Sequence, residues 1–443
     1  MAAARADAAT TTPATRVAIT GGRSLRGAYR VPGAKNAVLP MMAACLLTEE
    51  TCVIEDIPLI TDIMVMAELL RGLGAQVEID TERRSVAITA GGVHSTRPDP
   101  RLVRAMRASF QVTGPLLSRF GRVDCHAPGG CQLGTRPVNV DIEGFEVMGA
   151  SIALGGGVYQ AVADPLVGGQ VYLDYPSHTG TQNLLMAATL ASGYTTIVHA
   201  SREPEVIALV HFLRSMGAEI HGEGTSTIGV QGQSRLFGTV ARAIPDRIVG
   251  STMAVAAAIS AGDVELLNVR PDHLQPVLVK LAAMGVTLHE TNRSVRVTGS
   301  PMLSATAIQC IPFPGFPTDV QAAMGTLMTQ AHGESSIIER VYDGNLGYFG
   351  QLQRMGADVT VEGPTARIRG PSPLTACEVR LWTDIRAGAA LLLAGLVAHG
   401  TTVLDDAEII QRGYQDLPGD LQELGADITV ERRPRPAATA TVG

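Results

Sequence analysis

The chain has 443 residues, more than one hydrophobic core usually accommodates, so two or three domains are expected. Hydrophobic residues make up 46% and charged residues 17% of the sequence, a globular composition that excludes a largely disordered protein. The net charge of −7 disfavours a general nucleic-acid-binding protein, and no apolar stretch is long enough to predict a membrane span.

The two ends of the chain differ in composition from the rest. Residues 1–15 are rich in Ala and Thr and lack an apolar signal core, and residues 431–443 continue in Arg, Pro, Ala and Thr, so we expect both to be disordered. The cysteine spacing fits neither a disulfide framework nor a zinc ribbon, which indicates a protein of the reducing cytoplasm. These cysteines are Cys45, Cys52, Cys125, Cys131, Cys310 and Cys377.

One helix ending occurs six times along the chain. An apolar helical run ends in Leu or Met, followed by Gly, then Ala or Val, then a strand-like segment. The glycines lie 75, 68, 68, 71 and 69 residues apart and are Gly74, Gly149, Gly217, Gly285, Gly356 and Gly425. Glycine just past a helix is the usual left-handed stop, and a fixed period is the signature of a repeat architecture.

Each repeat contains more than this ending. An apolar helix and a strand precede the helix that stops at glycine, and one or more strands follow it, which is a βαβαββ-type unit. Segments 184–191 and 387–398 are apolar on all sides, so these helices must be fully buried. We therefore predict an α/β fold of six units, three per domain, with helices inside and sheets outside: an inside-out α/β barrel.

Eight ordered motifs accompany these units. They are Pro32-Gly33-Ala34-Lys35-Asn36, Met106-Arg107-Ala108-Ser109, Pro128-Gly129-Gly130-Cys131, Arg136-Pro137-Val138, Arg202-Glu203-Pro204-Glu205, Phe316-Pro317-Thr318-Asp319, Thr383-Asp384-Ile385-Arg386 and Arg412-Gly413-Tyr414. With the repeats, they resemble the enolpyruvyl transferases over roughly residues 17–430. The resemblance implies one domain at 35–244, a second at 16–34 plus 245–430, and an active site in the cleft between them.

Five cations from different units could grip an anionic substrate. Each opens or precedes a helix or lies in a Gly/Pro-bounded loop, where side chains and helix N-termini can converge on an anion. Taken singly, each arginine is better explained as a solvated surface charge. The resemblance implies that all five bind phosphoenolpyruvate or its leaving phosphate: Lys35, Arg107, Arg136, Arg386 and Arg412.

A thiol and a carboxylate are the candidates for proton transfer. Cys131 lies in a Gly-rich loop, and nearby cations lower a thiol pKa toward neutrality. The resemblance makes it the acid that protonates the methylene carbon of phosphoenolpyruvate, and the site of alkylation by fosfomycin. Asp319 opens a helix, where a helix cap is the simpler interpretation. The resemblance makes it the base for the acceptor hydroxyl, and Lys35 and Arg412 complete the catalytic set, without metal or cofactor.

The remaining predicted site residues concern substrate binding. The resemblance implies such a role for Asn36, Arg107, Arg136, Pro137, Val138, Ser177, His178, Thr179, Val341, Asn345, Asp384 and Arg386. For Asp384, a helix cap is again the alternative.

The sequence departs from the family pattern mainly on the acceptor side. The cell-wall enzyme that uses UDP-N-acetylglucosamine has Arg-Pro-Val-Asp-x-His, Ser-Val-Gly-Ala-Thr and Phe-Glu-Asn-Arg-Phe. This chain has Asn139 to Asp141 after the first three residues, His178-Thr179 in the loop, and Asn345 in place of the arginine. We therefore expect a uridine nucleotide acceptor, slightly favouring the 3′-hydroxyl of UMP, as in nikkomycin- and polyoxin-type pathways.

Three alternatives remain open at this point. The first is a UDP-N-acetylglucosamine 1-carboxyvinyltransferase of peptidoglycan synthesis that has drifted neutrally. The second is the shikimate-phosphate enzyme, which lacks the Gly-Gly-Cys loop. The third is a non-catalytic nucleotide-sensing relative, against which the intact set of Lys35, Cys131, Asp319 and Arg412 argues.

Overall fold

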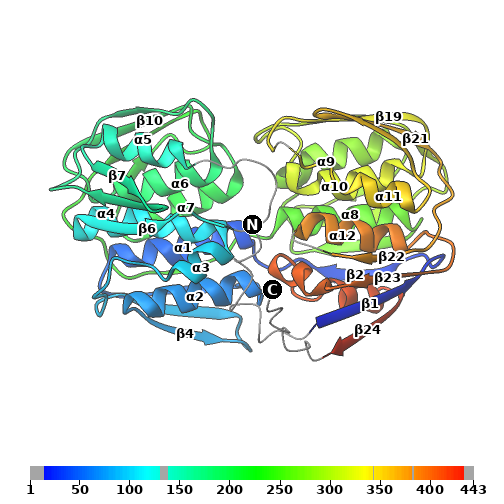
Figure 1. Ribbon diagram of the computed structural model, residues 1–443, viewed down its shortest axis with the longest axis horizontal. Coiled ribbons are helices and arrows are strands. Elements are labelled where there is room, and N and C mark those ends of the chain that lie inside the picture. Colours follow the sequence, from blue (N-terminus) through cyan, green and yellow to red (C-terminus); the bar gives the residue numbers. More distant parts are fainter. Residues whose placement is uncertain (1–13, 130–137, 343, 382–383, 434–443) are drawn as a thin grey trace, which may run out of the picture.

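The computed structural model describes residues 14–129, 138–342, 344–381 and 384–433 as two halves lying side by side (Figure 1). Two large hydrophobic clusters correspond to the halves. One is formed by buried residues between Val38 and Ala243, and the other by buried residues between Val17 and Val31 and between Ile248 and Ile428.

Three sheets belong to the first half. They have the strand orders β13-β3-β5-β4, β6-β8-β7 and β11-β12-β10-β9. The strands are β3 (Thr51–Glu55), β4 (Gln76–Asp80), β5 (Ser85–Thr89), β6 (Arg122–His126), β7 (Ser151–Gly155), β8 (Val158–Val162), β9 (Gln170–Tyr172), β10 (Tyr194–Val198), β11 (Glu219–His221), β12 (Thr227–Gln231) and β13 (Val240–Arg242).

Three further sheets belong to the second half. Their orders are β15-β16-β14-β2, β17-β19-β21-β20 with β18 also on β19, and β22-β23-β1-β24. The strands are β1 (Ala14–Thr20), β2 (Arg26–Arg30), β14 (Asp263–Leu267), β15 (Thr287–Glu290), β16 (Ser294–Thr298), β17 (Leu303–Ser304), β18 (Ala307–Cys310), β19 (Ala331–Glu339), β20 (Asp358–Glu362), β21 (Thr365–Gly370), β22 (Glu378–Arg380), β23 (Thr401–Asp405) and β24 (Asp427–Arg433).

Five of the six sheets share one pairing pattern. A central strand has a parallel neighbour on one side and an antiparallel pair of strands on the other, as in β9-β10-β12-β11 and β2-β14-β16-β15. Within the described residues, the sheet β6-β8-β7 is wholly antiparallel. Because each sheet pairs only within itself, these strands do not close into a barrel, which corrects that part of the expected fold.

The helices lie between the sheets. They are α1 (Lys35–Ala44), α2 (Thr61–Leu73), α3 (Pro100–Ala105), α4 (Thr113–Phe120), α5 (Asn139–Val147), α6 (His178–Ala188), α7 (Pro204–Ser215), α8 (Arg247–Ile259), α9 (Pro271–Ala283), α10 (Thr318–Met328), α11 (Phe349–Arg354), α12 (Ile385–Gly395) and α13 (Leu417–Glu423). Every residue of α8 is buried, and α8, α10 and α12 pack on one another. The predicted burial is confirmed for most of segment 184–191, in and after α6, and for most of segment 387–398, in and after α12.

The repeated glycines have the predicted left-handed conformation. Their φ angles lie between 89° and 107° at all six positions. A side chain in that region is strained, so glycine ends each helix and turns the chain into the following strand.

The two N-terminal strands belong to sheets of the second half. β1 lies between β23 and β24, and β2 pairs with β14 (Figure 1). The returning connection near residue 245 runs beside the outgoing one, since Gly33 and Pro245 form an isolated bridge and Ala34 N–H donates to the Ile244 carbonyl at 2.7 Å.

Two expected boundaries need correction. Residues 14–15 were expected in a disordered lead and 431–433 in a disordered tail, but Ala14 pairs with Arg433 and Thr15 with Arg432. Polar composition gave no hint of this pairing, because its partners lie at opposite ends of the sequence.

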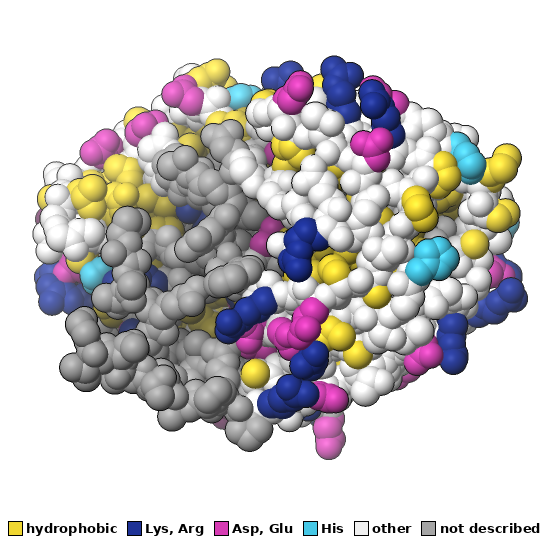
Figure 2. Space-filling view, turned by 45° about the vertical axis from the view of Figure 1, so that its right-hand side comes forward, with side chains coloured by type: hydrophobic (Ala, Val, Ile, Leu, Met, Phe, Trp, Pro, Cys, Tyr) yellow, Lys and Arg dark blue, Asp and Glu magenta, His cyan; other side chains and the backbone are white. Residues whose placement is uncertain are grey.

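Within the described ranges no helix is long and apolar enough to cross a membrane. On the face in Figure 2, cationic and acidic side chains lie interspersed.

Candidate active site

A cavity of about 580 Å³ opens between the two halves. The first half lines it mainly with the start of α1, the segment around Arg107, and the residues that lead into α6. The second half lines it with the starts of α8, α10 and α12 and with the loop that follows β19. Helix N-termini carry unpaired N–H groups and positive dipole ends, so this arrangement favours an anion.

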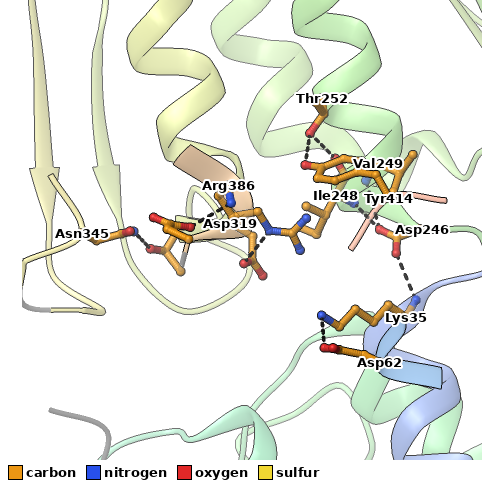
Figure 3. A network of polar contacts seen from close by, with 12 residues as sticks. Lys35, Asp62, Asp246, Ile248, Val249, Thr252, Asp319, Asn345, Arg386 and Tyr414 are labelled. Atoms are coloured by element: carbon orange, nitrogen blue, oxygen red, sulfur yellow. Dashed lines mark hydrogen bonds and ion pairs between the residues drawn. The ribbon is translucent and has the colours of Figure 1, made fainter. Parts of the chain in front are cut away.

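Two cations share one buried carboxylate at the floor of the cavity. Lys35 Nζ lies 2.7 Å from Asp62 Oδ2, and Arg412 Nε lies 2.9 Å from Asp62 Oδ1 (Figure 3 shows the lysine side). Lys35 and Asp62 belong to the first half and Arg412 to the second. The triad therefore joins the halves and fixes two positive charges at one place.

The charge balance of this triad favours the ionised carboxylate. Burial of the Asp62 side chain, which is 3% exposed, would raise its pKa, but the charges of Lys35 and Arg412 outweigh burial and hold the pKa below its ordinary value. Because one carboxylate serves two cations, the triad keeps a net positive charge that a bound anion can neutralise.

A second carboxylate, that of Asp246, links the start of α8 in the second half to the start of α1 in the first half. Asp246 Oδ2 accepts the Lys35 backbone N–H at 3.0 Å, and its Oδ1 accepts the N–H groups of Ile248 and Val249 at 2.8 and 3.0 Å (Figure 3). Asp246 therefore caps α8 and positions the first residue of α1 at the same time. Burial raises its pKa, an effect that the charge of Arg386 partly offsets.

Arg386 and Asp319 form the second-half wall. Arg386 Nε donates to Asp319 Oδ1 at 3.1 Å (Figure 3). Asp384 Oδ1 caps α12 by accepting the Arg386 N–H at 2.8 Å. Burial would lower the pKa of Arg386, but the charges of Asp319 and its neighbours raise it, so it stays charged. Its Nη1 is buried without a hydrogen-bond partner among the described residues, which leaves one donor for a ligand.

A buried ion pair joins the start of α7 to the start of α8. Arg247 Nε, at the start of α8, lies 2.9 Å from Glu205 Oε1 on α7, and the two side chains are 8% and 1% exposed. Charge attraction to Arg247 overcomes the opposing effect of burial and lowers the pKa of Glu205. Arg247 lines the cavity, so this pair lies at its edge.

The loop before α6 forms the wall opposite α10. Ser177 caps α6 by accepting the Gly180 N–H at 3.1 Å, and Ser177, His178 and Thr179 all line the cavity. His178 Nε2 is buried without a partner in the part of the chain that the structure describes. An unpaired ring nitrogen at a cavity wall is available to a ligand hydrogen bond.

Asn345 is buried and does not line the cavity. Its Nδ2 donates to Thr318 Oγ1 at 2.9 Å and to Glu339 Oε2 at 3.1 Å, and it is not among the lining residues. Glu339, which is buried, also accepts the Thr318 hydroxyl at 2.7 Å and the N–H groups of Val341 and Tyr342 at 2.7 and 3.3 Å. This network fixes the loop after β19 against the start of α10.

The structure brings most of the predicted site residues together. The lining includes Lys35, Asn36, Arg107, Ser177, His178, Thr179, Asp319, Val341, Asp384, Arg386 and Arg412. Asn345 and Val138 are both buried, and neither lines the cavity. Cys131, Arg136 and Pro137 fall outside the described residues.

Sequence reasoning missed Asp62, Arg247 and Arg340. Asp62 had a usable signal, because it occupies the buried face of α2 together with Met66, Leu69 and Leu73, where a charge is costly unless it is paired. Arg247 and Arg340 had none, since each is one arginine among many and its partner or cavity is set by distant segments.

This arrangement suits acid–base chemistry on an anionic substrate. It combines converging cations, a carboxylate that lines the cavity and unpaired donors, all of which can orient a phosphate-bearing molecule. Among the residues described, no group of three or more His, Cys, Asp or Glu could hold a metal ion.

Comparison with known proteins gives the class. A family model for EPSP synthase (3-phosphoshikimate 1-carboxyvinyltransferase) matches residues 19–421. UDP-N-acetylglucosamine 1-carboxyvinyltransferase 2 of Clostridium tetani is 41% identical over 413 residues, covering 93% of this chain and 99% of that protein. The UDP-N-acetylglucosamine 1-carboxyvinyltransferase of Desulfosudis oleivorans is 44% identical over 413 residues, covering 93% and 98%.

Solved structures agree with this class. The enolpyruvyl transferase NikO from Streptomyces tendae superposes with a TM-score of 0.86 at 26% identity, covering 95% of this chain and all of that one. EPSP synthase from Acinetobacter baumannii gives a TM-score of 0.72 at 20% identity over 95% of this chain, which concerns the fold alone. The chain belongs to the EPSP synthase family, and it is an enzyme of the enolpyruvyl (carboxyvinyl) transferase class.

Proposed function

We propose that this enzyme transfers the enolpyruvyl group of phosphoenolpyruvate to a hydroxyl of a uridine nucleotide and releases phosphate. The observation that carries the proposal is the convergence of Lys35, Arg386 and Arg412 on one cavity beside Asp319. Phosphoenolpyruvate carries a phosphate and a carboxylate, so it needs several fixed cations. The reaction is proposed to occur in the cytoplasm, without metal or cofactor.

Each residue has a distinct role in this proposal. Lys35, Arg107, Arg136, Arg386 and Arg412 hold the phosphate and the carboxylate. Asp319 accepts the acceptor hydroxyl proton as the new C–O bond forms, and Cys131 gives a proton to the methylene carbon. Loss of that carbon's proton and departure of phosphate then restore the double bond. Arg386 Nε, 3.1 Å from Asp319 Oδ1, holds the base in place.

The first acceptor candidate is UMP. His178 and Asn345 stand where the UDP-N-acetylglucosamine enzymes have a valine and an arginine, and Asn345 is engaged by Thr318 and Glu339. The wall next to the acceptor therefore lacks a guanidinium at position 345, which supports a different acceptor. Its reacting group would be the 3′-hydroxyl, held by Asn36, Ser177, His178, Thr179, Val341 and Asp384, with Arg136-Pro137-Val138 at the uracil ring.

The second candidate is UDP-N-acetylglucosamine. It is favoured by the 41–44% identity to carboxyvinyltransferases named for this substrate, against 26% to NikO. In either case we propose two domains, at 35–244 and at 16–34 plus 245–430, that close on the substrates, because ligands for one anion come from both.

Phosphate release tests the proposal. The enzyme is incubated with phosphoenolpyruvate and, in parallel, UMP, UDP-N-acetylglucosamine, shikimate 3-phosphate or no acceptor. Phosphate release that depends on a uridine nucleotide supports the proposal, and the higher kcat/KM identifies the acceptor. Release with shikimate 3-phosphate alone, or with none of them, contradicts it.

A further inference from the structure

Arg340 is a cavity residue without an assigned role. It directly follows β19, its side chain is exposed, and it lines the cavity together with Val341 and Tyr342. Its backbone N–H donates to the Cys310 carbonyl at 3.2 Å, so the main chain at this point is held by β18.

The other cations of the cavity are already engaged by the protein. Lys35 and Arg412 share Asp62, Arg247 pairs with Glu205, Arg386 pairs with Asp319, and Arg107 also has an interaction within the chain. Within the residues that the structure describes, the Arg340 guanidinium has neither an ion pair nor a hydrogen bond. A ligand anion could therefore bind it without displacing a carboxylate.

The residue before Arg340 makes its position rigid. Glu339 accepts hydrogen bonds from Thr318, Asn345, Val341 and Tyr342, so both sides of Arg340 are anchored to the start of α10. Asn345 donates its hydrogen bonds within this network and does not line the cavity. Among the described residues of this loop, the cation that lines the cavity is Arg340.

The loop of Arg340 faces the wall that leads into α6. Tyr175 lines the same cavity as Arg340, Val341 and Tyr342. Burial raises the pKa of Tyr175, and the charges of Tyr342, Glu203 and Glu339 raise it further. Tyr175, Ser177 and His178 line the cavity on that side. Arg340 thus shares the cavity with residues assigned above to the acceptor, whereas Lys35 and Arg412 are held by Asp62.

We propose that Arg340 is the specificity-determining residue that binds the phosphate of the nucleotide acceptor, in place of a guanidinium at position 345. This rests on the proposed function. A planar guanidinium can bind a phosphate through two parallel hydrogen bonds, which a neutral nucleoside cannot offer. The enzyme would therefore distinguish a nucleotide from its nucleoside mainly through this side chain.

The test compares Arg340→Gln with Arg367→Gln, an exposed arginine on β21 of the same half that pairs with Glu334. Steady-state kinetics are measured with UMP and UDP-N-acetylglucosamine, and binding of UMP and uridine is measured by calorimetry. For Arg340→Gln we expect acceptor KM and UMP Kd to rise about 10- to 100-fold. Uridine Kd, phosphoenolpyruvate KM and the Arg367→Gln enzyme should stay within about twofold of wild type.

The outcomes separate the two proposals. Wild-type turnover with a uridine nucleotide, combined with unchanged acceptor KM in Arg340→Gln, overturns the role of Arg340 and leaves the proposed function intact. Equal losses of UMP and uridine binding also overturn it, because they indicate a general defect of the loop. A wild-type enzyme that neither binds nor converts any uridine nucleotide overturns both.

Discussion

The Lys35 ammonium lies 2.7 Å from a carboxylate oxygen of Asp62, whose other oxygen lies 2.9 Å from Nε of Arg412. One buried acid thus holds cations from the two ends of the chain. Its removal should leave two close positive charges without a counter-ion, which is costly away from water.

Asp62→Asn should lower the free energy of unfolding by about 3 kcal/mol and should also reduce kcat/KM for phosphoenolpyruvate. Because the two cations then lack a partner, added phosphate should raise the Tm of the variant more than that of wild type. Thermal unfolding with and without phosphate measures both effects. Glu68→Gln, on the exposed face of the same helix, is the control and should behave as wild type. Equal phosphate shifts in all three proteins would argue against an anion site at the triad.

The pair between Arg247 and Glu205 should show strong coupling. Each single change, Arg247→Met or Glu205→Gln, leaves a buried group without its partner and should destabilise the protein by about 3–5 kcal/mol. The double variant should lose clearly less than the sum of the two. Urea unfolding of the four proteins gives the coupling energy, and additive losses would mean that the pair contributes nothing as a pair.

Asp141 should make stability depend on pH. Burial raises its pKa to about 6, although the hydrogen bond from Asn183 and the charge of Arg107 oppose this. The folded state therefore holds this proton more tightly than the unfolded state, so stability falls as pH rises from about 4 to about 6. Asp141→Asn should be more stable than wild type at pH 8, by on the order of 2 kcal/mol, and the difference should vanish near pH 4.

Asn can still accept the hydrogen bond that Asn183 Nδ2 donates to Asp141 Oδ1 at 2.7 Å, so geometry is preserved in this variant. Glu143→Gln, exposed on the same helix, serves as the control. A stability difference between Asp141→Asn and wild type that is constant from pH 4 to pH 8 would contradict the assignment.

Cys131→Asp should separate proton donation from alkylation. A carboxyl group can still protonate the methylene carbon, so we expect activity to persist, whereas labelling by fosfomycin should be lost. Mass spectrometry of the intact protein after incubation with fosfomycin measures the label. Labelling that continues in the variant would exclude Cys131 as the target.

The sequence predicted the repeats, the helix stops at glycine, the buried helices and eleven of the residues that line the cavity. These features depend on local patterns, such as the glycine after each helix, or on short motifs that resemble those of the enolpyruvyl transferases. The pairing of β1 with β24, the joint role of Asp62, and the hydrogen bond from Asn345 to Glu339 could not be predicted. They depend on which distant segments meet, and a single sequence does not record that.

The central claim is that carboxyvinyl transfer takes place in this cavity with Asp319 as the base, and one experiment tests it most directly. Wild type and Asp319→Asn are incubated with phosphoenolpyruvate and each uridine nucleotide, and the carboxyvinyl ether is quantified by mass spectrometry. We predict that wild type forms the product and that kcat of the variant is reduced by a factor of about 100 or more. The acceptor Kd should change little. A variant that forms the ether at the wild-type rate would contradict the account.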